Sequence, residues 1–222
     1  MNKIRLNLRD ILQNDLYRYC GKTSRSAFIG AYLRKPGFRF TFHLRKAAFY
    51  STRKKSMRIV SYLLHRMVLD HYRLKYGFDI PYTTSIGPGL YLGHFGGVVI
   101  HGGAVLGANI NIGQGVTIGI VNRGPHSGVP TLEDRVWVGA HAILVGRITI
   151  GHDALIAPGA YVNFDVPCMG VVLGNPGKLV SHAGSAGYVN NVLGGAESAP
   201  VPGVEWLKDQ SQKNEPDGNG AE

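Results

Sequence analysis

The chain has 222 residues, of which 44% are hydrophobic and 17% are charged, and its formal net charge is +10 at pH 7. This composition predicts one or two folded domains and excludes wholesale disorder. The sequence has no apolar run of membrane-spanning length and no signal-peptide core, and its two cysteines are too few for a disulfide scaffold. A reducing, cytoplasmic location is therefore expected.

The positive charge belongs to the N-terminal third. Residues 1–77 contain 18 Lys and Arg against 3 Asp and Glu, a net of +15. Residues 78–180 carry a net of −1 and residues 181–222 a net of −4. We expect these ranges to be a basic α-helical region, a repeat domain, and a closing segment followed by a disordered tail.

Helical patterns fill residues 5–77. An apolar stripe begins at Leu6, Pro36 interrupts the pattern, and a helix is predicted from Ser56 to Tyr76, with Gly77 after it.

Residues 37–55 mix aromatic rings with Lys and Arg, which is typical of an interfacial membrane segment. They also fit a helical cap whose rings pack on the repeat domain. Both interpretations stay open, and nucleic acid is not an expected partner because no DNA- or RNA-binding motif accompanies the charge.

From Ile86 to Val180 an aliphatic residue recurs at every sixth position, with a two-residue slip between Val98 and Ile100. A period of six fits neither a helix nor a lone strand. It predicts a mainly β fold, a left-handed parallel β-helix, in which three hexads close one coil and the aliphatic side chains stack inside. The repeated positions from Ile112 onward are Ile112, Ile118, Leu132, Val138, Leu144, Ile150, Ile156 and Val162.

One loop is expected to leave the coils. Fourteen residues separate Ile118 from Leu132, where two hexads would need twelve, and the intervening sequence keeps no repeat. Loops carried by rigid scaffolds often hold functional residues.

The start of the repeat domain contains three motifs: Asp79-Ile80-Pro81, Ile86-Gly87-Pro88-Gly89 and Leu92-Gly93-His94-Phe95-Gly96-Gly97. They resemble the D-I-H-P-x-A-x-I-G-x-G-x-x-x-D-H-x-x-G signature of the serine O-acetyltransferase branch of the hexapeptide acyltransferases. The resemblance covers residues 78–180 and ends at GNPGKLV, which is similar to the family's closing G-x-P-A-x-x-V.

The resemblance places the family's catalytic base on His94 and the carboxylate that orients it on Asp79. Imidazole suits the removal of a hydroxyl proton near neutral pH, and a carboxylate on its far nitrogen fixes the tautomer. The two residues are fifteen positions apart, which is close to one coil, so we expect them side by side on neighbouring turns. Without the motif, His94 would be a surface histidine and Asp79 a turn residue.

The resemblance also implies acetyl-CoA as acyl donor, bound in a groove between neighbouring subunits of a homotrimer. The family's contacts to pantetheine fall on Ile120, Ala140 and Pro158, and Lys178 is placed to meet a CoA phosphate. Apart from the resemblance, these are ordinary coil positions and a solvated lysine. No metal site is predicted, because no histidines or cysteines have ligand spacing.

The expected loop departs from the family. The G-D-R-H-P-K-[IL] segment, whose Arg and second His hold serine, corresponds to residues 127–132, with Gly128 and Val129 at those two positions. A site without the cation cannot pair the carboxylate of serine. The expected acceptor is therefore a sugar hydroxyl of an exopolysaccharide, capsule or lipopolysaccharide unit, with His126 and His101 as candidate contacts or else as exposed histidines.

Two alternatives stay open: a serine O-acetyltransferase of cysteine biosynthesis, and a non-catalytic trimeric β-helix scaffold. A lipid-linked glycan acceptor would explain the basic region as a peripheral contact with the inner face of the membrane.

Overall fold

The computed structural model of the protein describes residues 7–51 and 56–193. Four helices come first: α1 (Leu8–Cys20), α2 (Arg25–Arg34), α3 (Pro36–Ser51) and α4 (Ser56–Tyr76). The side chain of Asn7 caps α1 by accepting from the backbone N–H of Asp10, and Gly21 ends that helix in the left-handed conformation. Pro36 is the first residue of α3, where its missing N–H costs nothing.

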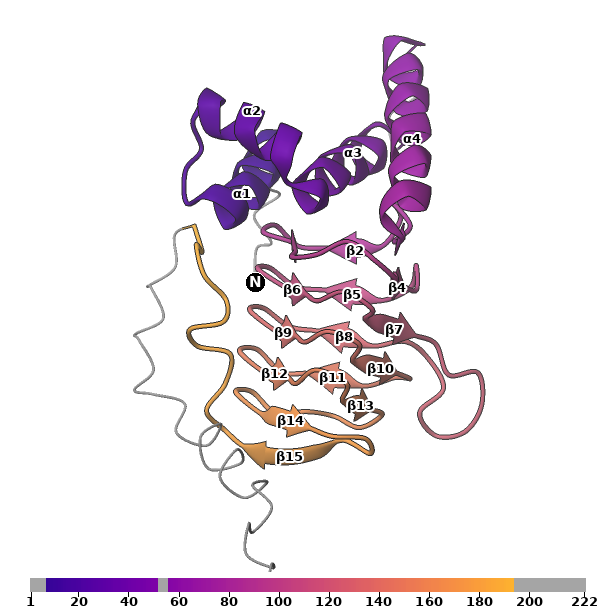
Figure 1. Cartoon of the computed structure of the whole chain (residues 1–222). Helices are drawn as coiled ribbons and strands as arrows, with labels where there is room; N and C mark the ends of the chain where they lie inside the picture. Colours follow the sequence, from indigo (N-terminus) through magenta and orange to yellow (C-terminus); the bar gives the residue numbers. More distant parts are fainter. Residues whose placement is uncertain (1–6, 52–55, 194–222) are drawn as a thin grey trace, which may run out of the picture.

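The rest of the described chain forms short strands wound into coils, one coil being a full turn around three sheets (Figure 1). Sheet A has the order β1-β4-β7-β10-β13, sheet B the order β11-β8-β5-β2, and sheet C the order β15-β14-β12-β9-β6-β3. All pairings are parallel except β14 with β15. The strands are β1 (Phe78–Asp79), β2 (Ser85–Ile86), β3 (Tyr91–Leu92), β4 (Val98–Ile100), β5 (Val105–Leu106), β6 (Asn111–Ile112), β7 (Thr117–Gly119), β8 (Thr131–Leu132), β9 (Trp137–Val138), β10 (Ile143–Val145), β11 (Thr149–Ile150), β12 (Leu155–Ile156), β13 (Tyr161–Val162), β14 (Val171–Leu173) and β15 (Lys178–Ser181).

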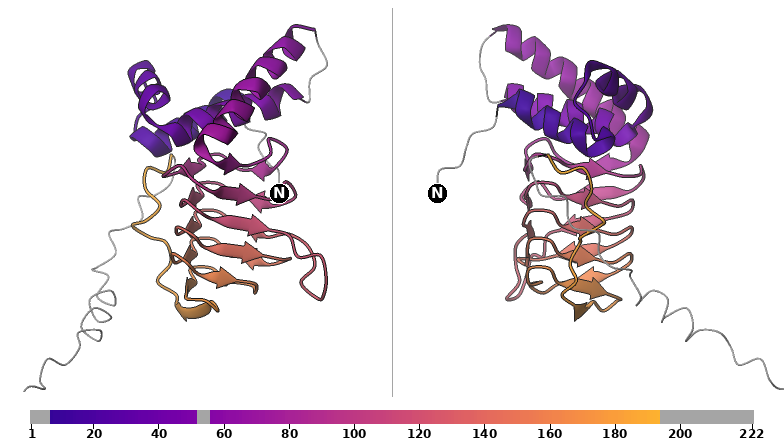
Figure 2. Two further views of the ribbon diagram at one scale, coloured as in Figure 1. Left: turned by 45° about the vertical axis from the view of Figure 1, so that its right-hand side comes forward. Right: turned by 90° about the vertical axis from the view of Figure 1, so that its left-hand side faces the viewer.

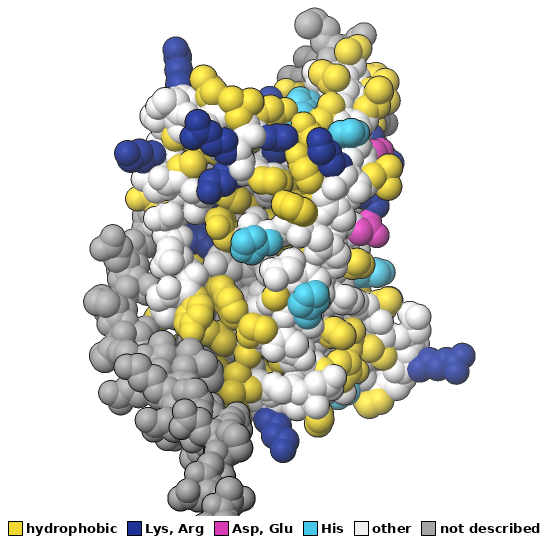
Figure 3. All heavy atoms as spheres, viewed as in Figure 1, with side chains coloured by type: hydrophobic (Ala, Val, Ile, Leu, Met, Phe, Trp, Pro, Cys, Tyr) yellow, Lys and Arg dark blue, Asp and Glu magenta, His cyan; other side chains and the backbone are white. Residues whose placement is uncertain are grey.

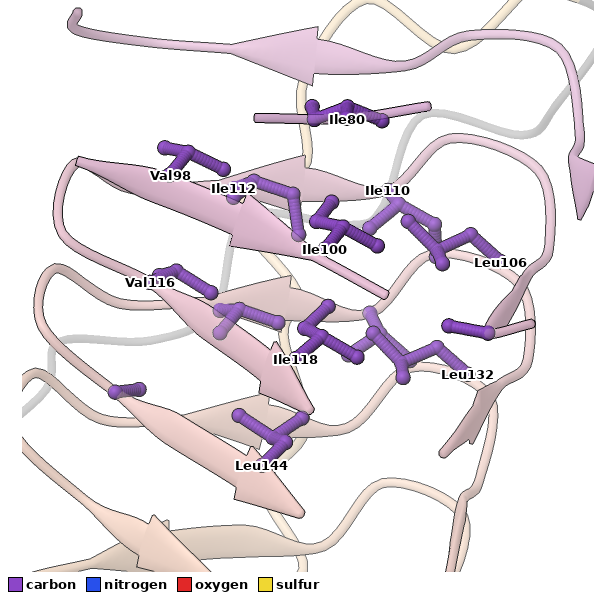
Figure 4. Close-up of a cluster of buried hydrophobic side chains, with 14 of the residues drawn as sticks. Ile80, Val98, Ile100, Leu106, Ile110, Ile112, Val116, Ile118, Leu132 and Leu144 are labelled. Carbon is purple, nitrogen blue, oxygen red and sulfur yellow. The ribbon is translucent and has the colours of Figure 1, made fainter. Parts of the chain in front are cut away.

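The interior of the coils is aliphatic, as the six-residue period predicts. Every repeated position from Ile112 to Val162 is at most 1% exposed. Figure 4 shows Ile100, Ile118 and Leu144 pointing inward from successive coils of sheet A. Each buried side chain of this size contributes roughly 1.5–3 kcal/mol of transfer free energy, so the stack is the main source of stability in this part. The prediction of a parallel β-helix is confirmed.

The two-residue slip has a structural counterpart at one corner. Leu92 pairs with Ile112, twenty residues further on, whereas Val99 pairs with Thr117, eighteen residues further on. The first coil therefore holds two extra residues between β3 and β4. They produce a bulged corner, residues 93–97, which the regular coils lack.

The loop after β7 is larger than expected. Thr117 pairs with Ile143, 26 residues further on, which is eight more than the eighteen between Val99 and Thr117. The expectation of a two-residue surplus over two hexads was wrong, because Ile118 and Leu132 lie on consecutive faces of one coil and a single hexad should separate them. A two-way backbone bridge between Val121 and Gly128 closes the loop at its base.

Helices α1 and α3 close the open end of the β-helix with buried charges. Asp15 is fully buried and its carboxylate accepts from the backbone N–H of Gly89 (2.7 Å) and Leu90 (3.1 Å). Arg45 pairs with Asp15 at 2.9 Å and donates to the carbonyl oxygen of Ile86 at 2.6 Å. The first coil has no coil above it, so these side chains satisfy backbone groups that would otherwise be left unpaired.

The aromatic residues of α3 pack inward. Phe38 and Phe40 are 0% exposed, and the ring of Phe40 lies 5.0 Å from that of Phe78 on the first coil. Of the two interpretations left open for residues 37–55, these two rings follow the helical cap: Phe40 packs on the first coil, and Phe38 packs against Leu16 of α1 and Phe28 of α2. Within residues 7–51 and 56–193, every helix is too short or too polar to cross a lipid bilayer.

The segment after β15 returns along the outside of the coils to the helices (Figure 2). The ring of Tyr188 lies 5.1 Å from that of Trp137, and Asn191 donates to the carbonyl oxygen of Arg18 at 3.4 Å. Residues 182–193 thus act as a strap that joins the coils to α1. The tail expected to be disordered, and Leu6 at the start of the apolar stripe, lie outside the described residues.

Candidate active site

The predicted site residues lie on two edges of sheet A. We call the corner where the chain passes from sheet C to sheet A the C–A edge, and the corner from sheet A to sheet B the A–B edge. His94 precedes β4 on the C–A edge, and His101 follows β4 on the A–B edge. The strands of sheet A separate the two edges within one protomer.

His94 lies in the bulged corner of the C–A edge. It is exposed, as is its neighbour Phe95, which is 63% exposed. No other described residue makes a hydrogen bond to the His94 ring. The two extra residues of the first coil push this part of the chain out of the regular path, so the imidazole is accessible to a substrate from outside the coils.

Asp79 borders the same corner but does not contact His94 in this structure. The register places Asp79 beside Val99, and Gly77 lies against the backbone of Gly97. The Asp79 carboxylate is 57% exposed and forms an ion pair with Arg73 of α4. The fifteen-residue spacing falls short of the twenty-residue first coil, so the expected side-by-side placement is not seen, and Asp79 would have to release Arg73 to orient an imidazole.

Two of the predicted donor-binding residues share the C–A edge with His94. Ala140 is half-buried and Pro158 is exposed one coil further along, and the N–H of Gly159 donates to the carbonyl oxygen of Ala140 at 2.8 Å. A Cβ on Gly139 would lie 2.5 Å from the nitrogen of Pro158, so these coils approach closely enough to require glycine there. The edge therefore presents small residues and backbone atoms.

The other two predicted donor-binding residues lie elsewhere. Ile120 is 43% exposed and stands on the A–B edge at the base of the loop. Lys178 is exposed at the start of β15, beyond the last full coil, and the N–H of the preceding Gly177 donates to the carbonyl oxygen of Tyr161. The structure does not bring Ile120 and Lys178 together with His94 in one protomer.

His101 and His126 belong to the A–B edge. The Nδ1 atom of His101 accepts from the backbone N–H of Gly103 at 3.1 Å. His126 is exposed in the loop, and its carbonyl oxygen accepts from the backbone N–H of Arg147 at 2.8 Å. The predicted acceptor contacts therefore gather around the loop, away from the corner that holds His94.

Sequence reasoning missed Arg147. A Cβ on Gly128 would lie 2.9 Å from the Cβ of Arg147, and the guanidinium donates to the carbonyl oxygen of Pro125 at 3.1 Å. An exposed cation thus lies directly beside the position where the family motif has arginine. Nothing in the sequence signals this, because the two residues are nineteen positions apart and meet only through the coil register.

No group of three metal-ligating side chains among the described residues is arranged to hold a metal ion.

Comparison with known proteins adds three findings. No family model matches the chain. Serine acetyltransferase 2 of Arabidopsis thaliana is 39% identical over 105 residues, which is 47% of this chain and 32% of the relative. The serine acetyltransferase of Bacillus subtilis is 32% identical over 123 residues, which is 55% of this chain and 57% of the relative. The chain thus spans about a third to just over half of these curated relatives.

Solved structures extend the match into the helices. The crystal structure of Neisseria gonorrhoeae serine acetyltransferase in complex with serine has a TM-score of 0.62 and 31% identity over 78% of this chain and 69% of that chain. The chain belongs to the hexapeptide-repeat acyltransferase family. The soybean apoenzyme has a TM-score of 0.64 at 28% identity with the same coverage. The expected fold, a left-handed parallel β-helix behind an α-helical region, is that of this family.

Proposed function

We propose that this protein is an acetyl-CoA-dependent O-acetyltransferase and that its acceptor is the hydroxyl group of serine. The likeness to the gonococcal enzyme crystallised with serine supports this more than any single residue does. The proposal revises the sugar acceptor expected from the sequence, because the relatives reported above are serine acetyltransferases.

In this proposal His94 removes the hydroxyl proton as the oxygen attacks the thioester carbonyl, and the thiolate of CoA leaves. An accessible imidazole without a competing hydrogen bond is free to accept that proton. Asp79 would orient the ring after releasing Arg73. The N–H groups of Gly93 and Gly96 already donate to carbonyl oxygens of neighbouring chain segments, so the other backbone N–H groups of the corner would have to stabilise the oxyanion that forms on the attacked carbonyl.

The division of the site over two edges supports a homotrimer. His94 and the loop lie at opposite ends of β4, so one protomer does not present both to the same substrate. A ring of three protomers would set the C–A edge of one against the A–B edge of the next. The groove between them would hold the pantetheine arm along Ile120, Ala140 and Pro158, with Lys178 near a CoA phosphate.

A sugar hydroxyl is the second candidate acceptor. One observation favours it: Gly128 and Val129 supply neither the cation nor the imidazole that the family's motif uses for serine. A glycan acceptor on a lipid would also give the basic helical end a role at the membrane surface. A third candidate is a non-catalytic trimeric scaffold. If the protein had that role, a His94→Ala variant would keep the protein's biological output.

One experiment tests these proposals together. CoA release from acetyl-CoA is measured with serine and with a panel of sugars and glycans, beside the His94→Ala variant. We expect release with serine that the variant loses. Release with a glycan alone would contradict serine as acceptor, and equal release by the variant would contradict His94 as base.

A further inference from the structure

A cavity of about 460 Å³ is lined mainly by residues of α1 and α2. Figure 1 shows these two helices at the end of the molecule opposite β15. The floor of the cavity is apolar and includes Leu8, Leu12 and Phe28. Its lining also includes exposed cations, Arg9 from α1 and Arg25 from α2 among them. Neither the proposed transfer chemistry nor the packing of the first coil uses this cleft.

The cations of the cleft have no acidic partner among the residues that the structure describes. Arg9 and Arg25 are exposed and form no ion pair with any described residue, and none of the described residues lining the cleft is acidic. Lys46 of α3 also lines it, with its ammonium group 5.3 Å from the ring of Phe42 and 5.9 Å from that of Tyr50. Three cations therefore converge on one opening without neutralisation, which favours an anionic ligand.

The start of α2 adds to this preference. Ser24 caps the helix by accepting from the backbone N–H of Ala27, and the first turn contains no acidic residue. The positive end of the helix dipole thus lies at the same opening as Arg25. A ligand that complements the cleft needs a negative group to pair with the cations and an alkyl chain to contact Leu8 and Leu12.

We propose that the α1–α2 cleft binds an anionic phospholipid of a membrane, with the phosphate at Arg9, Arg25 and Lys46 and part of an acyl chain on Leu8 and Leu12. This inference is independent of acetyl transfer. It differs from the membrane contact expected from the sequence, which relied on the aromatic rings of residues 37–55.

The exposed surface of the helical end as a whole supports a membrane as the source of the ligand. Figure 3 shows Lys and Arg side chains gathered over the helices, with hydrophobic side chains between them and along α4. Large apolar side chains are exposed on two helices of this end: Ile29 and Leu33 on α2, and Ile59, Val60, Leu63, Leu64, Met67 and Leu74 on α4. Exposed apolar groups beside unpaired cations are what an anionic bilayer surface contacts.

The test first uses soluble probes. Binding of octyl, decyl and dodecyl phosphate below their micelle concentrations is measured by calorimetry, with inorganic phosphate beside them. We expect affinity to rise about three- to fourfold for each added methylene, since each buries apolar surface, and inorganic phosphate not to bind measurably. Equal affinity for inorganic and dodecyl phosphate, or no binding of any alkyl phosphate, would overturn the proposal.

Matched variants locate the site. The double variant Arg9→Glu/Arg25→Glu is expected to bind dodecyl phosphate at least tenfold more weakly, whereas Arg34→Glu/Lys35→Glu, with the same charge change at the other end of α2, keeps the affinity within twofold. All four side chains are exposed, so the fold should persist, and thermal unfolding checks this. Equal losses in both variants would mean that diffuse charge, not the cleft, binds the probe.

Vesicle flotation then identifies the source. The protein should float with phosphatidylglycerol vesicles and not with phosphatidylcholine vesicles, and the cleft variant should lose most of that binding. If the cleft variant binds alkyl phosphate weakly but floats as the parent protein does, the cleft takes a soluble amphiphile and the membrane assignment is wrong.

Discussion

The β-helix and the helical end use charge in opposite ways. Residues 78–180 carry a net of −1, and their interior is almost wholly aliphatic. The helical end carries a net of +15 within residues 1–77, yet it buries Asp15 and Arg45 against the first coil. Charge at the helical end thus has two separate roles, since some cations hold the two regions together and others lie at the surface and form no ion pair with a described residue.

The largest expected effect concerns the β-helix. His94→Ala should lower kcat for acetyl transfer by about 10²- to 10⁴-fold, the usual contribution of a general base, and should leave the melting temperature unchanged because the ring is exposed. CoA release and thermal unfolding measure the two quantities. His71→Ala, at an exposed histidine of α4, is the control. If His94→Ala kept more than half of the activity, His94 would not be the general base.

The next effect tests the joint between the two regions. Asp15→Ala should lower the free energy of unfolding by about 3–5 kcal/mol, because it leaves the buried Arg45 guanidinium without its counter-charge and two backbone N–H groups of the first coil unpaired. Urea unfolding measures the change.

Asp70→Ala is the matched control, since Asp70 pairs with Arg66 and Arg73 at a surface where such pairs contribute at most about 1 kcal/mol. Equal losses in the two variants would show that the buried pair does not join the regions more strongly than a surface pair does.

The two regions also differ in how far the sequence predicts them. The inward side chains of the coils follow from the six-residue period alone, and even the slip between Val98 and Ile100 marks the corner that carries His94. The size of the loop did not follow, because counting hexads requires knowing which face each one occupies. The Asp79–Arg73 pair and the position of Arg147 could not be predicted from the sequence either. The first depends on a contact between α4 and the first coil, and the second on a contact between the loop and a coil.

In the helical end, composition predicted a basic surface but could not separate buried from exposed cations. Arg45 and Arg25 look alike in the sequence, and only the packing of α3 on the first coil distinguishes them. The same holds for the apolar residues, since Phe40 packs inward while Met67 is 71% exposed.

A pH effect between pH 6.5 and 4 is expected in the helical end. His43 is 5% exposed between α3 and α4, and burial, together with the nearby His65, Lys46 and Arg39, lowers its pKa to about 4. Its Nδ1 atom lies 2.9 Å from that of His65, and its Nε2 atom 2.9 Å from the hydroxyl of Tyr32.

Because the unfolded chain has an ordinary histidine pKa near 6.5, it binds a proton between pH 6.5 and 4 that the folded chain does not. The free energy of unfolding should therefore fall by up to about 3 kcal/mol as the pH drops through this window. Urea unfolding at several pH values measures the slope, and His43→Gln should flatten it. An unchanged slope in that variant would assign the effect to other groups.

The smallest expected effect decides between acceptors. If Arg147 supplies the cation that Gly128 lacks, Arg147→Ala should raise the KM for serine about tenfold and leave the KM for acetyl-CoA unchanged, because the guanidinium lies beside the position at which the family's motif pairs the carboxylate of serine. Arg147→Lys should recover part of the loss. Arg123→Ala, at an exposed cation of the same loop, is the control. A sugar acceptor has no carboxylate for Arg147 to pair. The KM for a glycan substrate should therefore change less than twofold in Arg147→Ala, and this outcome would favour a sugar hydroxyl over serine as the acceptor.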